Sequence, residues 1–122
     1  MLIKINFQSD EAIYVQLYNQ IVMGIATSQL VNGESLPSVR KLAEEIGINM
    51  HTVNKAYDVL RQEGYLTLDR RRGAVICVDS DKQRALRQMK NQMRVILAQG
   101  HCKNITKEEV HQLVDDLMAE YR

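Results

Sequence analysis

Helical segments, a short β-hairpin and two further helices succeed one another along this chain of 122 residues. Five segments show apolar side chains every three to four residues, the spacing of one helix face. These segments are 13–25, 39–46, 53–60, 86–97 and 110–121. Their order, with two strand-like runs after the third, predicts a mainly α fold with a small β-hairpin: a winged helix-turn-helix followed by an αα-hairpin.

The first helix follows an extended segment over residues 1–9, and Asp10 is a candidate N-cap for it. Its apolar positions recur every four residues, which places them on one face, and we expect it to end before residue 30. That face carries Ile13, Leu17, Ile21 and Ile25.

Two short helices joined by a tight turn come next. Pro37 biases the preceding residue away from helix, and Ser38 is a good N-cap for a helix that Gly47 closes. Asn49 can cap the following helix, which we expect to end near Gly64. Two helices with a short glycine-containing turn between them make the helix-turn-helix unit.

A hairpin is predicted after the third helix. Residues 65–68 alternate as a strand does, and 74–78 are rich in β-branched side chains. The polar stretch 69–73 forms the tip between these strands. We expect Cys77, on the second strand, to be a small buried hydrophobe.

The C-terminal part is predicted to be two helices. Ser80 or Asp81 caps a helix of roughly 18 residues by the 3.6-residue period, and Gly100 ends it. Thr106 and Glu109 fit the capping box of the next helix. We therefore divide the chain into a winged helix-turn-helix domain over 1–78 and a helical hairpin over 79–122.

The apolar stripes of this hairpin are too extensive for two helices to bury on each other, so we expect a second copy of the chain to cover them. The predicted dimer interface comprises Leu86, Met89, Met93, Ile96, Leu97, Val110, Leu113 and Leu117.

Composition excludes several classes of protein. Apolar residues make up 45% of the chain, which suffices for a packed core. Sixteen Lys and Arg against 15 Asp and Glu leave a net charge of +1, so attraction to nucleic acid must come from locally clustered cations. The chain has no apolar run of the ~18 residues that a membrane span needs, and its first residues lack a secretion signal. We expect a cytoplasmic protein with reduced cysteines and no membrane partner.

The sequence supports neither catalysis nor metal binding. It contains no nucleophile spaced from a base and no glycine-rich phosphate loop, so we expect no enzyme and no cofactor. His101 and Cys102 are adjacent, but the spacings of a zinc site are missing. Cations do cluster in the predicted winged domain, at Arg40 and Lys41, at Lys55, and over 70–72.

An ordered run of motifs resembles the GntR family of bacterial transcription regulators. It comprises Ile13-Tyr14-x-Gln16-Leu17, then Leu36-Pro37-Ser38-Val39-Arg40-Lys41-Leu42-Ala43, then Ile48-Asn49-x-x-Thr52-Val53-x-Lys55-Ala56-Tyr57-x-x-Leu60-x-x-Glu63-Gly64-Tyr65-Leu66. The short tail of two helices is similar to the YtrA-type subfamily. The resemblance implies homodimers that bind operator DNA, usually as repressors.

With this resemblance, the expected DNA contacts lie at the starts of the second and third helices and on the wing. Arg40 is the leading candidate. Helix N-terminal side chains reach base edges in helix-turn-helix proteins, and asparagine can pair with adenine. The full set is Ser38, Arg40, Asn49, Met50, His51, Thr52, Asn54, Lys55, Arg70, Arg71, Arg72 and Gly73.

The wing departs from the family pattern, because Arg71 stands where the family usually has the first glycine of Gly-x-Gly-Thr-Phe-Val. Two other functions stay open at this point. A winged helix also serves as a protein–protein interaction module, which the near-neutral charge favours. A ligand sensor with a small cavity between the tail helices is the other, and the sequence leaves a small-molecule effector undecided.

Overall fold

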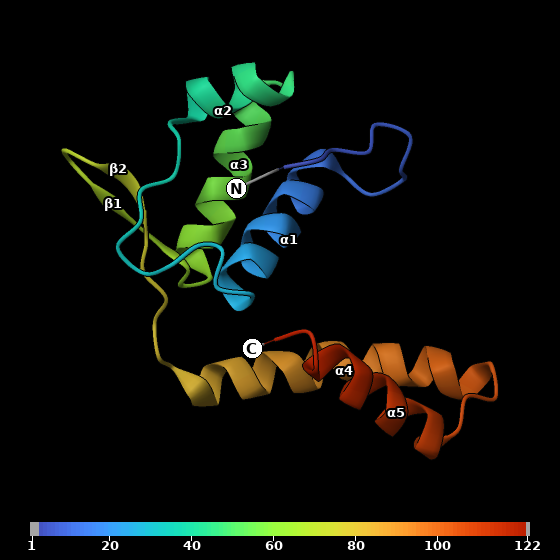
Figure 1. Cartoon of the computed structure of the whole chain (residues 1–122). Coiled ribbons are helices and arrows are strands. Elements are labelled where there is room, and N and C mark those ends of the chain that lie inside the picture. Colours follow the sequence, from blue (N-terminus) through green and yellow to red (C-terminus); the bar gives the residue numbers. More distant parts are fainter. Residues whose placement is uncertain (1–2, 122) are drawn as a thin grey trace. The chain divides into compact units, whose positions relative to one another are not determined.

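The computed structural model describes residues 3–121 and divides the chain into two compact units, Met1–Asp79 and Ser80–Arg122. The first unit contains three helices and a two-stranded antiparallel hairpin, and the second contains two helices (Figure 1). The predicted fold class, a mainly α winged helix-turn-helix with an αα-hairpin after it, is confirmed.

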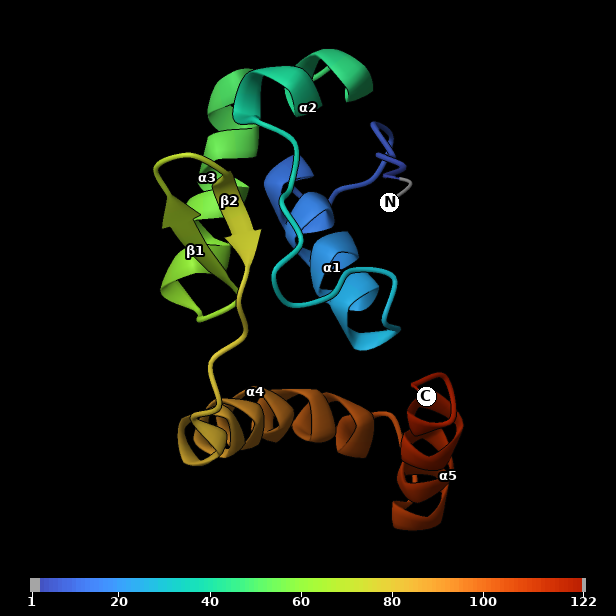
Figure 2. The same cartoon turned by 60° about the vertical axis from the view of Figure 1, so that its left-hand side comes forward.

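The first unit is built around α3 (Met50–Gln62). Helices α1 (Ile13–Ala26) and α2 (Val39–Ile46) and strand β1 (Leu66–Asp69) all pack against it (Figures 1 and 2). Apolar side chains from every one of these elements form one core. Its fully buried members are Leu17, Ile21, Val53, Ala56, Leu60 and Ile76.

Two glutamine side chains, one turn apart on α1, attach the extended N-terminal segment to the helix. The Gln16 amide is 8% exposed; it accepts from the N–H of Asn6 at 2.8 Å and donates to the Asn6 carbonyl at 3.0 Å. The Gln20 amide forms the same pair of bonds with the backbone of Lys4. The glutamines thus satisfy backbone groups that a neighbouring strand would otherwise pair.

The prediction that Asp10 caps α1 is wrong. The N-cap position is Ala12, which makes no side-chain capping bond. The Gln16 amide also donates to the Glu11 carbonyl at 3.0 Å, so a bond from inside the helix holds the preceding chain in place of an acidic cap.

The caps predicted for α2 and α3 are confirmed. Ser38 Oγ accepts from the N–H of Lys41 at 3.1 Å, and Asn49 Oδ1 accepts from the N–H of His51 at 2.7 Å. Gly47 ends α2 with a φ of +72°, a left-handed conformation that glycine adopts at no steric cost. The turn of the helix-turn-helix therefore depends on three residues that local chemistry specifies.

The hairpin pairs β1 with β2 (Gly73–Ile76) so that Leu66 faces Ile76. Both strands differ by one or two residues from the predicted spans. The segment before α2 adds an unpredicted third strand contact, in which Ser35 bridges Val75. Backbone bonds of 2.8 Å, from Leu36 N–H to the Ala74 carbonyl and from Ile76 N–H to the Glu34 carbonyl, tie the start of α2 to the hairpin.

The expectation that Cys77 is buried is wrong. Its backbone N–H continues the pairing by donating to the Tyr65 carbonyl at 3.0 Å, but the residue is exposed. The strand ends at Ile76, and Cys77 lies just beyond its three consecutive buried residues, Ala74–Ile76.

In the second unit, α4 (Lys82–Cys102) is longer than predicted because Gly100 does not end it. Asp81 is the cap, accepting from the N–H of Arg84 at 3.1 Å. The helix ends instead at Cys102, and the chain reverses at Asn104, which has a φ of +63°. The N–H of Ile105 donates to the Gly100 carbonyl, a Schellman motif with asparagine in the left-handed position.

Helix α5 (Lys107–Met118) starts with the predicted capping box. Thr106 Oγ1 accepts from the N–H of Glu109 at 3.2 Å, and the Glu109 carboxylate accepts from the N–H of Thr106 at 2.9 Å. These bonds hold the pKa of Glu109 below its usual range. Neither α4 nor α5 contains a buried residue. The two helices diverge from their connecting turn (Figure 2).

Candidate nucleic-acid interface

The start of α3 presents a row of polar side chains. Val53, Ala56, Tyr57 and Leu60 turn one face of the helix into the core. The opposite face leaves Asn49, Met50, His51, Asn54 and Lys55 exposed and Thr52 half-buried. Hydrogen-bonding side chains on the first two turns of an otherwise anchored helix suit contact with base edges in a groove.

The start of α2 is fixed relative to α3 by a bond that the sequence did not suggest. The hydroxyl of Tyr57 donates to the Pro37 carbonyl at 2.8 Å. Burial raises the pKa of Tyr57, and the Glu45 carboxylate raises it further, so the hydroxyl stays protonated and remains a donor. The bond thus ties the residue before α2 to α3, and Ser38 and Arg40 at the start of α2 remain exposed.

Arg40 is unpaired among residues 3–121: its guanidinium forms no ion pair or hydrogen bond with another described residue. On α3, the carboxylate of Asp58 pairs with the guanidinium of Arg61, with an N–O distance of 3.4 Å. A cation without an internal partner keeps its full capacity to bind an external anion such as a phosphate.

The wing tip is ordered by one carboxylate. Asp69 accepts from the backbone N–H groups of Arg71 at 2.8 Å and Arg72 at 3.0 Å. These bonds hold the pKa of Asp69 below its usual range. Gly73 follows with a φ of +75°, a conformation that favours glycine.

The three wing arginines are therefore not equivalent. The Arg72 guanidinium donates to the carbonyl of Gly33, so it braces the wing against the strand segment before α2. Arg70 and Arg71 are exposed and make no side-chain bond with the described part of the chain. Arg71 has a negative φ, so this backbone position does not need the glycine that the family pattern has there.

Lys55 contacts α1. Its ammonium lies 4.1 Å from the centre of the Tyr14 ring, within the range of a cation–π interaction. A shallow groove surrounds the pair, and its remaining lining residues are Ala12, Ile13, His51 and Thr52. Tyr14 and Lys55 belong to different sequence motifs, and only the packing of α1 on α3 brings their side chains together.

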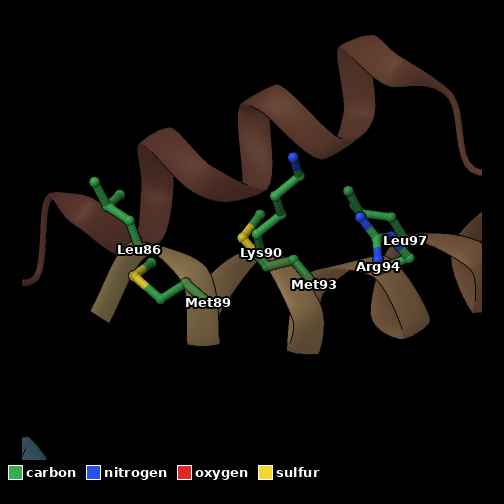
Figure 3. A pocket seen from close by; sticks show the side chains of 6 residues that line it. All are labelled: Leu86, Met89, Lys90, Met93, Arg94 and Leu97. Carbon is green, nitrogen blue, oxygen red and sulfur yellow. The ribbon is translucent and has the colours of Figure 1, made fainter. Parts of the chain in front are cut away.

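The second unit carries a contrasting apolar surface. Leu86, Met89, Met93 and Leu97 line a groove along α4, with Lys90 and Arg94 beside them (Figure 3). With Ile96, Leu113 and Leu117, the four apolar residues are 37–61% exposed, and Val110 is half-buried. The predicted interface residues thus lie on open faces of α4 and α5.

Two features are absent from the part of the chain that the structure describes. No three His, Cys, Asp or Glu side chains within 3–121 gather as a metal ion requires. Within the same residues, no helix is long and apolar enough to cross a membrane.

A three-helix unit with a helix-turn-helix and a β-hairpin wing defines a winged helix-turn-helix protein. Residues 13–76 match the family of bacterial regulatory proteins, gntR family. The chain belongs to this GntR family, whose members are DNA-binding transcription regulators rather than enzymes.

Similarity extends over the whole chain. The HTH-type transcriptional repressor YtrA of Bacillus subtilis (strain 168) is 28% identical over 99% of this chain and 95% of its own length. The structure of YtrA from Sulfolobus acidocaldarius, a GntR-family transcription factor, has 35% identity and a TM-score of 0.61, covering 97% of both chains. A transcriptional antiterminator from Listeria monocytogenes EGD-e reaches a TM-score of 0.87 at 26% identity, covering 97% of this chain and 90% of its own. The resemblance to the YtrA-type subfamily is thereby confirmed.

Proposed function

We propose that the protein is a homodimeric, sequence-specific repressor that binds an inverted-repeat operator. In this proposal α3 enters the major groove, and the wing lies on the flanking backbone or in the minor groove. The observation that carries it is the set of exposed polar side chains at the start of α3, Asn49, His51, Asn54 and Lys55, together with the unpaired guanidinium of Arg40 on α2. Asparagine and arginine are the side chains best suited to bidentate pairing with adenine and guanine.

The apolar surface of α4 and α5 supports the homodimer. Exposed apolar patches of this extent mark interaction sites in proteins that are otherwise well packed. The helices also differ in charge: α4 carries five Lys or Arg and no Asp or Glu, whereas α5 carries four acids and one Lys. Pairing α4 of one copy with α5 of the other would therefore join complementary surfaces, and a two-fold arrangement makes each pairing twice.

A two-fold dimer implies a near-palindromic site, because each winged unit meets one half-site. Repression is proposed from the similarity to YtrA, which is named a repressor. We place the protein in the cytoplasm because bacterial operator DNA is there.

The experiment is a selection from random duplex DNA, with the winning site retested across salt concentrations. We expect an enriched inverted repeat, and affinity that falls steeply with salt as several phosphates are neutralised. Arg40→Ala should weaken operator binding by about 1–3 kcal/mol if it contacts a base. Arg61→Ala is the matched control, since Arg61 is an exposed α3 arginine paired with Asp58.

The absence of any enriched duplex would contradict the proposal and favour a winged helix that binds proteins. Enrichment of a single asymmetric half-site would contradict only the dimeric part. Equal losses for Arg40→Ala and Arg61→Ala would remove Arg40 from the interface.

A further inference from the structure

The contact between Lys55 and Tyr14 carries an inference that rests on the proposed DNA binding and extends it. Lys55 is exposed on the second turn of α3, whereas Tyr14 is half-buried at the start of α1 and packs against the core. The ammonium lies 4.1 Å from the ring centre. The flexible side chain of Lys55 on α3 thus rests on the Tyr14 ring of α1, and we call this ring the platform.

The platform is rigid for two reasons. Tyr14 lies one turn before Tyr18 on α1. The ring of Tyr18 packs edge to face against the ring of Tyr65, and this contact anchors α1 next to Tyr14. Gln16 lies buried two residues later and fixes the incoming chain. A lysine side chain has four rotatable methylenes, and stacking on a fixed ring removes part of the entropy it would lose on binding.

The direction of the side chain matters as much as its rigidity. The Lys55 side chain reaches from α3 to α1, where its ammonium lies over the Tyr14 ring. Its groove has His51 and Thr52 on one side and the start of α1 on the other. An ammonium is a compact charge with three donors; the ring face leaves its N–H bonds able to meet a phosphate oxygen.

We propose that Lys55 binds a backbone phosphodiester of duplex DNA in the groove between α1 and α3, and that Tyr14 is the positioning residue that holds its ammonium there. Lys55 then contributes to affinity without reading sequence. Base reading at this end of α3 is left to neighbours such as Asn54.

The test compares operator and unrelated duplex across salt concentrations. Lys55→Ala should weaken both by a similar factor and reduce the slope of log affinity against log salt by about one. Tyr14→Leu, which keeps an apolar side chain but removes the ring, should weaken both by about twofold to fivefold, as expected for loss of an exposed cation–π contact. Tyr14→Phe retains the ring face and should bind both duplexes as tightly as the unaltered protein does.

Three further variants separate this role from a structural one. In the Lys55→Ala background, Tyr14→Leu should have no additional effect, because the positioned cation is gone. Arg61→Ala removes an exposed α3 cation that pairs with Asp58 and does not take part in the Lys55–Tyr14 contact, so it should leave the salt slope unchanged. Asn54→Ala should weaken operator binding far more than binding to unrelated duplex. Thermal unfolding of each variant checks that folding is retained.

The inference is overturned if Lys55→Ala relaxes the preference at one base pair while the salt slope stays the same, since Lys55 then reads a base. It is equally overturned if Tyr14→Leu and Tyr14→Phe bind alike, or if the two positions prove additive. Failure of the proposed function looks different, because the unaltered protein would then select no duplex at all.

Discussion

The two units of this chain divide their apolar residues in opposite ways. Met1–Asp79 packs a core of apolar side chains around α3, and all the buried residues of the described chain lie in this unit. Ser80–Arg122 has well-capped helices but buries none of its side chains. Capping satisfies backbone groups at helix ends, but only packing removes apolar area from water. The first unit therefore has its own core, whereas the second leaves the apolar faces of its helices exposed.

The largest expected effect is on the core of the first unit. Leu17→Ala removes a fully buried side chain and should lower the free energy of unfolding by about 2–5 kcal/mol. Urea unfolding monitored by circular dichroism measures it. Leu113→Ala, a truncation of the same kind at a 54% exposed position of α5, is the control, and its effect should depend on protein concentration. Equal losses of unfolding free energy for Leu17→Ala and Leu113→Ala, independent of protein concentration, would contradict the difference between the two units.

Placing a charge in the α4 groove should act on association rather than on folding. Met93→Asp puts a carboxylate among Met89, Leu97 and their neighbours, and burying it against a second copy is costly. We expect sedimentation equilibrium to show monomers at concentrations where the unaltered chain is dimeric. Gln99→Asp adds the same charge to α4 outside the groove and should leave dimers intact. Unchanged association of Met93→Asp would mean that another surface joins the copies.

Gly64 tests how the first unit ends. It has a φ of +86°, and a Cβ there would lie 1.9 Å from an Asp79 carboxylate oxygen. Gly64→Ala should destabilise the protein by about 1–3 kcal/mol through backbone strain and displacement of Asp79. Gly33→Ala also has a positive φ but open space around it, so thermal unfolding should show a smaller loss. A loss for Gly33→Ala that is no smaller than that for Gly64→Ala would indicate that backbone strain alone, without the contact to Asp79, sets the loss of stability.

The smallest effect concerns pH, where each unit has one carboxylate to compare. Asp69 in the wing and Glu109 in the capping box both have a lowered pKa, because backbone N–H groups donate to the charged form. Their stabilisation is present above the pKa of the unfolded chain, around pH 4, and is lost as the pH falls through the lower folded values. NMR titration of both carboxyl groups should give midpoints below the ordinary values for Asp and Glu side chains. A midpoint at the ordinary value would mean that the turn or the capping box is open in solution.

Local chemistry allowed much of the fold to be predicted. Ser38, Asn49 and the Thr106–Glu109 pair cap helices through bonds that span two or three residues, so the printed sequence contains both partners. The same holds for Gly47, since a left-handed turn between two periodic segments favours glycine. The predictions for Asp10 and Gly100 were wrong for a related reason. Each residue type is compatible with a helix boundary, but the Gln16 bonds hold the chain before α1, and the left-handed Asn104 follows the end of α4.

The sequence alone therefore determined the helices, most of their caps, the hairpin and the kinds of side chain offered to DNA, because these follow from periodicity and from short-range hydrogen bonds. The tertiary structure decided what depends on residues far apart in the chain. It set the Tyr57 bond to Pro37, the brace from Arg72 to Gly33, and the platform that Tyr14 makes for Lys55. These contacts span 20 to 41 positions, counted from the residue numbers, and only packing of α1, α2 and the wing around α3 brings their atoms within bonding distance.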